Sequence, residues 1–467
     1  MRVSKSSDNG LVLTADGSRI RSVGLFGAVS FVVGSMLGIG IFIVPPEVAG
    51  LTPNLGFFFG VWAFGGLVAL AGADCFAELG SAYPRAGGDF AFQRQAFGSS
   101  VAFATGCVLF IGVFGGSIAA VAVPLWNFQI SALLGQDLTK LQFELGWFTL
   151  NASQIGAVFL VAFITFINTT RARNWSAFQV FLTTIPVLIL TALAIYILTA
   201  TDPVLVPDPV QATVPWSDLT AAYLGVYFAY SGWNAVIYIA GEVKKPGRVI
   251  PRALVGGTLL VTVLYALICC SFVHVLGLTG LSGAGEAGTH VAQKLGHAYG
   301  ANIVAVLVAS ALLASLNATI SGGARIAYAM AKDGALWSKL AEGETDGVPK
   351  NALWAQAFWA MALILTGSFE QLIQLTGLAM LITGSLTVVA LIKLRRDEPD
   401  TPRPYRSFCY PLMPAFYLCV NVGVIAFKLV EAFEGKQGSL YPIIGVFILG
   451  LAFLIHLSWR RLRHVPA

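Results

Sequence analysis

FVVGSMLGIGIFIVPP, residues 31–46, is the stretch that decides the fold of this chain. It lies in a run apolar enough to cross a bilayer, yet Gly34, Gly38 and Gly40 fall close together and two prolines follow. Glycine costs about 1 kcal/mol relative to alanine inside a helix, so a continuous helix is disfavoured here. Unwound backbone is tolerated inside a membrane only where protein or water surrounds it. We therefore expect an interrupted span that lines a binding site.

The two half-helices beside such a break offer complementary partial charges. The half-helix that begins near Ile39 would present free N–H groups and the positive end of its dipole to an anion such as a carboxylate. The half-helix that ends near Met36 would offer carbonyl oxygens to an ammonium group. Together these groups suit an amino acid zwitterion.

The composition indicates a multi-span membrane protein. The chain has 467 residues, of which 57% are hydrophobic and 11% charged, and its mean hydropathy is +0.78. Soluble domains are roughly 25% charged, which excludes a soluble protein. A span needs about 20 apolar residues. About twelve spans are expected on this basis, at 26–50, 55–81, 98–126, 152–169, 175–200, 217–241, 253–277, 299–331, 351–367, 370–392, 408–430 and 440–460.

The placement of basic residues predicts the orientation. Lysines and arginines such as Arg85, Lys244 and Arg395 gather before the first span, after each even-numbered span and at the C-terminus. The opposite loops hold only Lys140, Lys294, Lys428 and Lys436. By the positive-inside rule, both termini are expected in the cytoplasm of a multi-pass protein of the cell (inner) membrane.

A second interrupted span is expected at residues 225–234, GVYFAYSGWN. Ser231, Gly232 and Asn234 break an aromatic-rich apolar helix there, five spans after the first break. Paired interruptions at matching positions in two halves are typical of inverted-repeat transporters with a site at the membrane midplane. The alternative is that the glycines only allow close helix packing, as the GxxxG spacing of Gly34 and Gly38 would.

Motifs for enzymatic or metal chemistry are missing from the sequence. The six cysteines form no CxxC pair, and no histidines stand at ligand spacing, so we expect no disulfide framework, no metal and no cofactor. HExxH, GxSxG and Gly-rich phosphate-loop motifs are also lacking. We therefore expect that the protein is not an enzyme and has no catalytic residues.

Six motifs are spread over almost the whole chain. They are GSMLGIGIF (34–42), AELGSAYPRAGGDFAFQRQAFG (77–98), FAYSGWN (228–234), GEVKKPGRVIPRAL (241–254), SLNATISGGARIAYAMAKDGAL (315–336) and RPYR (403–406). In combination they resemble the amino acid-polyamine-organocation superfamily, and within it most of all the L-type amino acid transporter group.

The resemblance implies an all-α polytopic membrane protein with a LeuT-like architecture. Its core would be a five-plus-five inverted repeat whose helices 1 and 6 are broken, followed by two further helices. The implied organisation is a cytoplasmic N-terminal segment (1–25), a first five-helix repeat (26–200), a second, inverted five-helix repeat (217–392), two additional helices (408–460) and a cytoplasmic tail (461–467).

The resemblance also implies which groups hold the substrate. Backbone N–H groups at Ile39, Gly40 and Ile41 would bind its carboxylate. The carbonyls that would receive its ammonium group belong to Met36, Phe228 and Ser231.

Other roles follow from the same resemblance. The Phe228 ring would be the lid that closes the pocket from outside, while Trp233 and Asn234 would brace the unwound turn. Tyr230 would belong to the gate, with plain packing in the core as its alternative.

Two departures from the family pattern bear on substrate and coupling. Ile39 replaces a small polar residue on the pocket floor but leaves the backbone donors in place. Helix five, at 178–190, lacks the lysine whose ammonium replaces sodium in many relatives. Its TTIP, at 183–186, is more similar to arginine/agmatine exchangers. The polar side chains expected near helix one, for coupling or support, are Thr183, Thr184 and Tyr265, although threonines in helices often bond their own backbone.

Two features near the cytoplasmic end need interpretation: an acidic pair and an amphipathic stretch. Asp74 and Glu78 stand one turn apart. They could form a proton relay, but we favour an interfacial pair that interacts with Arg85 or with the basic loop after helix six. The amphipathic stretch 83–97 is expected to be an interfacial element of the inner gate, as in the superfamily.

Taken together, we expect a secondary active transporter that moves a small amino acid by alternating access, as an exchanger or a proton-linked, sodium-independent permease. A cationic amino acid/polyamine antiporter is the first alternative, because of helix five. A membrane-embedded amino acid sensor without flux is an alternative of another class. The loop at 127–151 has no cysteine, so no disulfide-linked heavy chain is expected. Partners are an amino acid and membrane lipid, with no nucleic acid.

Overall fold

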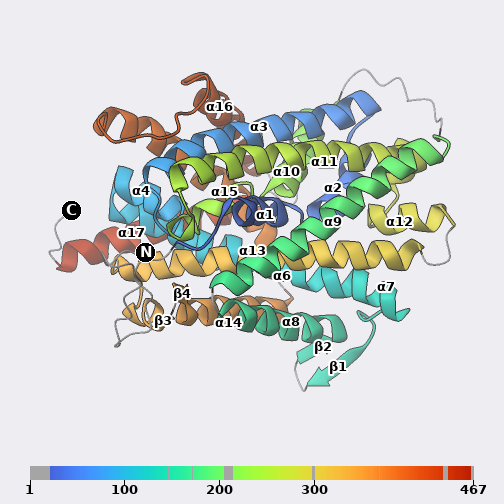
Figure 1. Cartoon of the computed structure of the whole chain (residues 1–467), viewed down its shortest axis with the longest axis horizontal. Coiled ribbons are helices and arrows are strands. Elements are labelled where there is room, and N and C mark those ends of the chain that lie inside the picture. The colour runs from blue at the N-terminus through green and yellow to red at the C-terminus, as the bar shows by residue number, and fades with distance from the viewer. Residues whose placement is uncertain are drawn as a thin grey trace.

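The helices of the protein lie mostly along the long axis of the molecule (Figure 1). The computed structural model describes residues 21–145, 148–170, 172–204, 214–296, 300–345, 347–367, 369–434 and 440–463. The predicted terminal segments, 1–25 and 461–467, fall in large part outside these described residues.

The elements are labelled in chain order. The α-helices are α1 (Leu25–Met36), α2 (Gly40–Leu51), α3 (Leu55–Ala82), α4 (Asp89–Phe97), α5 (Ser99–Cys107), α6 (Gly115–Pro124), α7 (Ser131–Leu134), α8 (Ala152–Asn168), α9 (Ala172–Ala200), α10 (Trp216–Tyr230), α11 (Pro246–Ser282), α12 (Ala287–Lys294), α13 (Gly300–Lys332), α14 (Lys350–Thr366), α15 (Phe369–Asp397), α16 (Leu412–Phe433) and α17 (Leu440–Arg463). The π-helices are η1 (Val108–Phe114) and η2 (Leu125–Ile130), and the 3-10 helices are η3 (Ala235–Ile237), η4 (Ala240–Glu242) and η5 (Ser338–Leu340). Two antiparallel hairpins pair β1 (Gln142–Leu145) with β2 (Phe148–Asn151) and β3 (Glu344–Thr345) with β4 (Val348–Pro349).

Several helices are long and apolar enough to cross a membrane. Within the described residues there are 7 such helices, or 8 when the bent pair α1 and α2 counts as one span. Other expected spans coincide with shorter helices: α8 and α14 have 17 residues each, and α10 has 15. Length and composition alone therefore support a multi-span protein, while the count of twelve stays a prediction.

The first glycine-rich stretch is broken where its sequence predicts. α1 ends at Met36 and α2 begins at Gly40, with a bend of 40° between them. The Gly38 N–H turns back to the carbonyl of Met36 at 2.7 Å, which ends the α-helical hydrogen-bond pattern. Pro45 and Pro46 do not end the helix, since both lie buried inside α2.

The second expected interruption follows α10. That helix ends at Tyr230, and Gly232 adopts a positive φ of 95°, a conformation that glycine tolerates without strain. The chain continues through the short helices η3 and η4 instead of resuming an α-helix. The two interrupted segments thus differ: the first resumes as α2, whereas the second continues as 3-10 turns.

The interrupted segment α1 lies at the centre of the helix packing. It contacts α9, α11 and α13, and α2 contacts both α10 and α11. Close approach depends on glycine here, because a Cβ on Gly34 would lie 2.2 Å from the Gln179 side chain and 2.4 Å from that of Thr183. The centre of the molecule is therefore built from the two interrupted segments and the helices that hold them.

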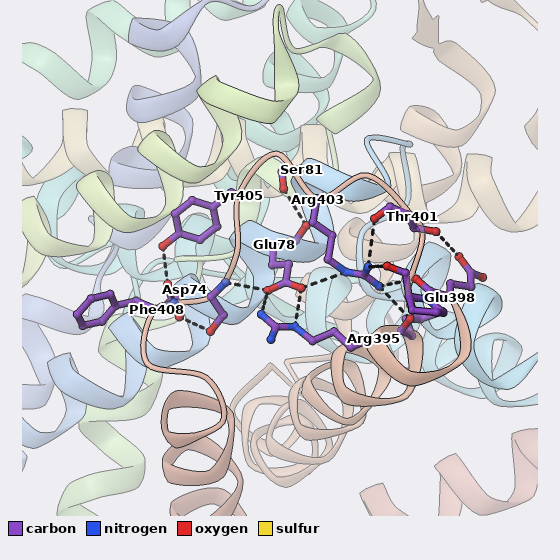
Figure 2. A network of polar contacts seen from close by, with 12 residues as sticks. Asp74, Glu78, Ser81, Arg395, Glu398, Thr401, Arg403, Tyr405 and Phe408 are labelled. Atoms are coloured by element: carbon purple, nitrogen blue, oxygen red, sulfur yellow. Dashed lines mark hydrogen bonds and ion pairs between the residues drawn. The ribbon is translucent and has the colours of Figure 1, made fainter.

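A buried ionic network ties α3 to the segment after α15. Figure 2 shows Glu78 between Arg395 and Arg403. Its carboxylate accepts from Arg395 Nε at 2.8 Å, and Arg403 Nε lies at 3.3 Å. The Ser407 backbone N–H also donates to it, at 2.7 Å. The Glu78 side chain is 1% exposed, so this charge depends on its two guanidinium partners.

Asp74, one turn earlier on α3, also bonds to the segment that follows α15. Its carboxylate accepts from the hydroxyls of Tyr405 and Ser407 and from the Phe408 N–H, the last at 3.1 Å (Figure 2). Burial raises the pKa of the Tyr405 hydroxyl, as does its bond to Asp74. The partners expected from sequence, Arg85 and the basic loop after helix six, are wrong, because the segment after α15 folds back over this face of α3.

A smaller polar contact beside this network joins the ends of α3 and α15. The Tyr83 hydroxyl donates to the Glu398 carboxylate at 2.7 Å, and the Gln95 amide donates to it at 2.6 Å. Burial raises the pKa of Tyr83 to about 12, and the bond from Tyr83 is the main cause of a lowered pKa at Glu398. This end of the molecule is therefore fastened by side chains that are far apart in sequence.

Candidate functional site

A cavity of about 100 Å³ lies between the two interrupted segments. Most of its wall is backbone and small or apolar side chains, with a few hydroxyl groups and one carboxylate. Residues from the first break that line it are Ser35, Met36, Gly38, Ile39 and Gly40, and those from the second are Phe228, Ala229, Ser231, Gly232, Trp233 and Asn234. The remaining wall includes Val113, Ser117, Ser315, Thr319, Asp89, Tyr238, Thr383 and Tyr417.

The two breaks contact each other backbone to backbone. A Cβ on Gly40 would lie 2.6 Å from Ala229 Cα, and one on Gly232 would lie 2.8 Å from the Ser35 carbonyl oxygen. Real Cβ atoms essentially never approach other atoms so closely. Glycine at these two positions is therefore needed for the breaks to face one another across so small a cavity.

Backbone donors gather at the start of α2. Gly40 begins the helix and Ile39 is its N-cap, so the N–H groups of Ile39, Gly40 and Ile41 have no carbonyl one turn earlier in α2 to bond. Ile39 and Gly40 line the cavity, whereas the Ile41 side chain is fully buried beside it. This end of α2 carries the positive end of its dipole and can receive an anion.

Backbone acceptors lie at the ends of α1 and α10. The Met36 carbonyl accepts from the Gly38 N–H and from the Tyr265 hydroxyl, so both of its lone pairs are engaged. The Phe228 carbonyl accepts the Ser231 N–H at 2.9 Å. A bound ammonium group that used the Met36 oxygen would share it with Tyr265.

Tyr265, on α11, connects the two breaks through its hydroxyl. The hydroxyl donates to the backbone oxygens of Met36 and of Ala229, the latter at 3.0 Å. The side chain is fully buried, and its ring packs against Trp62 and Tyr230 at centroid distances of 5.8 and 5.1 Å. One side chain thus bonds to both interrupted segments.

For the transport function expected from the sequence, replacing Tyr265 with phenylalanine should lower amino acid uptake about tenfold while the protein still inserts. The Met36 and Ala229 carbonyls each lose a donor, a cost of about 1–3 kcal/mol, and the two breaks lose their common bond. Uptake into proteoliposomes by equal amounts of purified protein measures the effect. Tyr196→Phe, at a tyrosine of α9 that is 51% exposed, is the matched control. Equal uptake by Tyr265→Phe and wild type would contradict this role.

The remaining predicted residues are placed as follows. Trp233 lines the cavity and packs between Phe76 and Tyr417, with ring centroids 4.8 and 6.3 Å away. The Asn234 amide donates to the Tyr238 hydroxyl at 3.2 Å. Tyr230 is only 2% exposed and is not among the cavity-lining residues, so it packs in the core beside Tyr265.

The two threonines of α9 are placed on different faces. Thr183 is buried, and its hydroxyl donates to the Ser30 carbonyl of α1 at 3.1 Å. Thr184 is exposed, because consecutive residues of a helix point about 100° apart. Of the pair, only Thr183 contacts the first interrupted segment.

The helix-five segment, which lacks the lysine found in many relatives, packs against α1 through a neutral amide side chain. Gln179 is fully buried, and its amide nitrogen donates to the carbonyls of Ser30 and Ala314 at 3.3 and 3.1 Å. Its oxygen accepts from Asn317 at 2.6 Å, and Asn317 in turn accepts from Asn168 at 2.7 Å. Helices α1, α9, α13 and α8 are therefore linked here without a charged group.

Sequence reasoning missed the polar wall of the cavity next to α4. Asp89, Tyr238 and Thr383 line this wall, and Tyr417 reaches it from α16. The segment that contains Asp89 was predicted to be an interfacial gate element, but Asp89 itself was not assigned to the site. A carboxylate within a membrane-associated segment was the available signal.

An ion pair involves Glu242, which follows the wall residue Tyr238 closely in sequence. Arg325 of α13 contacts Glu242 of η4 at 2.6 Å, and the two side chains are 3% and 15% exposed. Arg325 also donates to the carbonyl and hydroxyl of Ser321 at 2.6 and 2.7 Å. The pair joins α13 to the end of the second interrupted segment.

Within the described part of the chain, no group of three or more His, Cys, Asp or Glu side chains is arranged to hold a metal ion. The polar groups of the cavity are backbone amides, hydroxyls, one amide side chain and one carboxylate. These groups can bind a small polar molecule at both ends.

Comparison with known proteins identifies the family. The family model described as "Amino acid permease" matches residues 23–457, and the chain therefore belongs to the amino acid permease family. The predicted membership of the amino acid-polyamine-organocation superfamily is confirmed, and the protein is a transporter and not an enzyme.

Individual relatives are amino acid transporters by name. The "Serine/threonine exchanger SteT" of Bacillus subtilis (strain 168) is 26% identical over 421 residues, which cover 89% of this chain and 93% of the relative. The "Asc-type amino acid transporter 1" of Mus musculus is 25% identical over 449 residues, which cover 94% of this chain and 82% of the relative. The human "Large neutral amino acids transporter small subunit 2" is 26% identical, with coverage of 88% and 76%.

Proposed function

We propose that this protein is a secondary active transporter that moves a small neutral amino acid across the cell membrane by alternating access. One observation supports the proposal: residues at the start of α2 and at the ends of α1 and α10 line the same cavity, so that the free N–H groups of the first and carbonyls of the others could bind one molecule. Such a site binds both charges of a zwitterion through backbone and leaves its side chain to the rest of the wall.

In the proposed arrangement, twelve spans form a LeuT-like five-plus-five inverted repeat (26–200 and 217–392) followed by two more helices. The up to eight apolar candidate spans and the two interrupted segments support this architecture. Both termini would lie in the cytoplasm, which the distribution of basic residues supports.

The proposed contacts with substrate follow the backbone groups. The carboxylate would accept from the N–H groups of Ile39, Gly40 and Ile41, and the ammonium group would bind carbonyls of Met36, Phe228 and Ser231. The roles proposed around them are Phe228 as outer lid, Tyr230, Trp233 and Asn234 as gate or support, and Thr183, Thr184 and Tyr265 as support of the first break. Buried bonds of Thr183 and Tyr265 to α1 support the last proposal, whereas the exposure of Thr184 gives it no such support.

A small neutral side chain fits the rest of the wall. The cavity is about 100 Å³, and Ile39, Val113 and Ala318 give it apolar surface. Hydroxyls of Ser117, Ser315 and Thr319 also line it and could bond a hydroxylated side chain. Alanine, serine and threonine are therefore the proposed class of substrate, consistent with the named substrates of the Bacillus subtilis relative.

The helix-five segment supports our proposal that transport is coupled to exchange or to protons, without sodium. The helix-five position near α1 holds Gln179, whose amide already binds two backbone carbonyls there. We also propose that the protein works without a disulfide-linked heavy chain, because residues 127–151 contain no cysteine.

Uptake of labelled amino acids into proteoliposomes tests the proposal. We expect alanine, serine and threonine to be taken up saturably and released unchanged, at least about tenfold faster than arginine, agmatine or tryptophan, because one apolar pocket discriminates by about 1–3 kcal/mol. Assays with and without internal amino acid, sodium and a pH gradient separate exchange from proton-linked uptake.

The same assay distinguishes the alternatives. Asp89 on the cavity wall is the observation that favours a cationic amino acid/polyamine antiporter, and preferred uptake of arginine or agmatine would support that class instead. A sensor without flux predicts saturable binding of amino acid to the detergent-solubilised protein and no uptake in any condition.

A further inference from the structure

Asp89 is a buried carboxylate on the wall of the substrate cavity. It is the first residue of α4, is 2% exposed and lines the same cavity as the two breaks. It is the only Asp, Glu, Lys, Arg or His among the lining residues of that cavity in the described chain. The proposed zwitterionic substrate has no net charge that would require such a group.

Two hydroxyl groups contact the carboxylate. Oδ2 accepts from the Tyr238 hydroxyl at 2.7 Å, and Oδ1 lies 2.6 Å from the Thr387 hydroxyl oxygen. The Tyr238 oxygen in turn accepts from the Asn234 amide at 3.2 Å, which leaves the Tyr238 hydrogen directed at Asp89. Asp89 is thereby linked to the second interrupted segment through Tyr238 and Asn234.

No cation balances this carboxylate. Among the described residues, no Lys, Arg or His nitrogen lies within the 4.0 Å of an ion pair with Asp89. The basic groups of neighbouring elements have other partners: Arg94 of α4 pairs with Asp333 at 2.8 Å, and Arg325 of α13 pairs with Glu242 at 2.6 Å. The titratable groups that face Asp89 are tyrosines, Tyr238 by contact and Tyr227 of α10 by its charge interaction.

The remaining elements packed against α4 contribute neutral groups. From α5, the Thr105 hydroxyl donates to Gln93 at 2.6 Å, and from α15, Thr383 and Thr387 contact the same Gln93 amide, each at 2.9 Å. An ionised Asp89 would thus be a single buried charge, which is costly inside a protein. Burial accordingly raises the pKa of this carboxyl.

The hydrogen bonds around Thr387 accommodate both protonation states of Asp89. When the carboxylate is ionised, the Thr387 hydroxyl donates to Oδ1. When Oδ1 carries a hydrogen, it donates to the Thr387 oxygen, and the Thr387 hydrogen turns to the Thr383 carbonyl, 3.1 Å away. The Gln93 amide donates to the Thr387 oxygen in either case, at 2.9 Å. The hydrogen bonds around the carboxyl can therefore satisfy either protonation state through rotation of one hydroxyl.

We propose that Asp89 binds the proton that this transporter moves together with its amino acid. The inference rests on the proposed function and assigns its coupling site. The carboxylate takes up one proton at Oδ1 from water when the cavity is open to the outside, keeps it while the cavity is closed, and releases it to water when the cavity is open to the cytoplasm. Because only the protonated form is neutral, net uptake is driven by external acid and falls as the pH rises through the pKa of Asp89.

Asp89→Asn in proteoliposomes tests the assignment in two assays. Asparagine keeps an acceptor for Tyr238 but cannot titrate. Counterflow, with unlabelled alanine inside and labelled alanine outside, needs no proton gradient and is the reference to which net uptake by each variant is compared. Net uptake driven by an imposed pH gradient, and the acidification reported by a trapped pH dye, are expected to be lost in the variant. Asp333→Asn is the control, because it removes the partly exposed carboxylate that pairs with Arg94 of α4. This variant should keep both gradient-driven net uptake and acidification.

The outcomes separate the coupling site from the function. The role of Asp89 alone would be overturned if Asp89→Asn still moved protons and showed gradient-driven uptake. It would also be overturned if the wild type showed counterflow but neither proton movement nor gradient-driven uptake. Absence of counterflow for every amino acid in wild type would overturn the proposed function itself.

A second variant covers the case in which Asp89→Asn fails to insert. Thr387→Val keeps the carboxyl and removes a hydroxyl that lowers its pKa. We expect the pH profile of net uptake to move up by roughly one pH unit. An unmoved profile would overturn the proposal.

Discussion

Amino acid uptake is expected to fall below about a tenth of the wild-type rate when Gly40 is replaced by valine, since overpacking at a tight contact costs about 1–3 kcal/mol or more. The first added carbon would lie 2.6 Å from Ala229 Cα and 3.0 Å from Ala229 Cβ. The backbone of α10 would have to move away, which separates the N–H groups of α2 from the carbonyls across the cavity. Proteoliposome uptake by equal amounts of inserted protein measures the loss.

Gly256→Val is the matched control for this variant. Gly256 lies on α11 with nothing within 4 Å of an added Cβ, so the substitution should leave uptake close to wild type. Near-normal transport by Gly40→Val would show that the contact between the two breaks is unimportant, and the assignment of the binding site would then fail.

The largest expected effect on stability comes from Glu78→Ala. Two guanidinium groups and the Ser407 N–H lose their common acceptor. Breaking a buried ion pair by removing one partner costs about 3–5 kcal/mol. We therefore expect a clearly lower thermal unfolding temperature in detergent and a lower yield of inserted protein.

An exposed ion pair on α15, the helix that carries Arg395, provides the comparison. Lys393 pairs with Asp397, and their side chains are 42% and 44% exposed. Lys393→Ala should change the free energy of unfolding by no more than about 0.5 kcal/mol. If Glu78→Ala proved as stable as Lys393→Ala, the network of Figure 2 would not be what fastens this end of α3.

The interrupted segments could be predicted from sequence because their cause is local. Three glycines at Gly34, Gly38 and Gly40 weaken one stretch of backbone whatever surrounds it, and α1 and α2 separate there. Gly232 acts in the same way through its positive φ. Hydropathy likewise indicated a membrane protein, because each span is a property of consecutive residues.

The polar wall of the cavity could not be predicted, because its contacts are not local. Asp89 and Thr387 are 298 positions apart and meet only when α4 packs against α15. The prediction of the partners of Glu78 was wrong for a similar reason, because Arg395 is 317 positions away in sequence. Charge and spacing identified the acids, but only the packing of helices identified what each acid contacts.

The hydroxyl of Tyr265 has a mechanical consequence for the transport cycle. It binds the last carbonyl of α1 and a carbonyl near the end of α10, so neither end can shift far alone without giving up a buried bond. During opening and closing, the two ends and the α11 segment between them would rock as a single rigid lever. In the alternating-access cycle proposed above, this lever would tilt as one body against the surrounding helices.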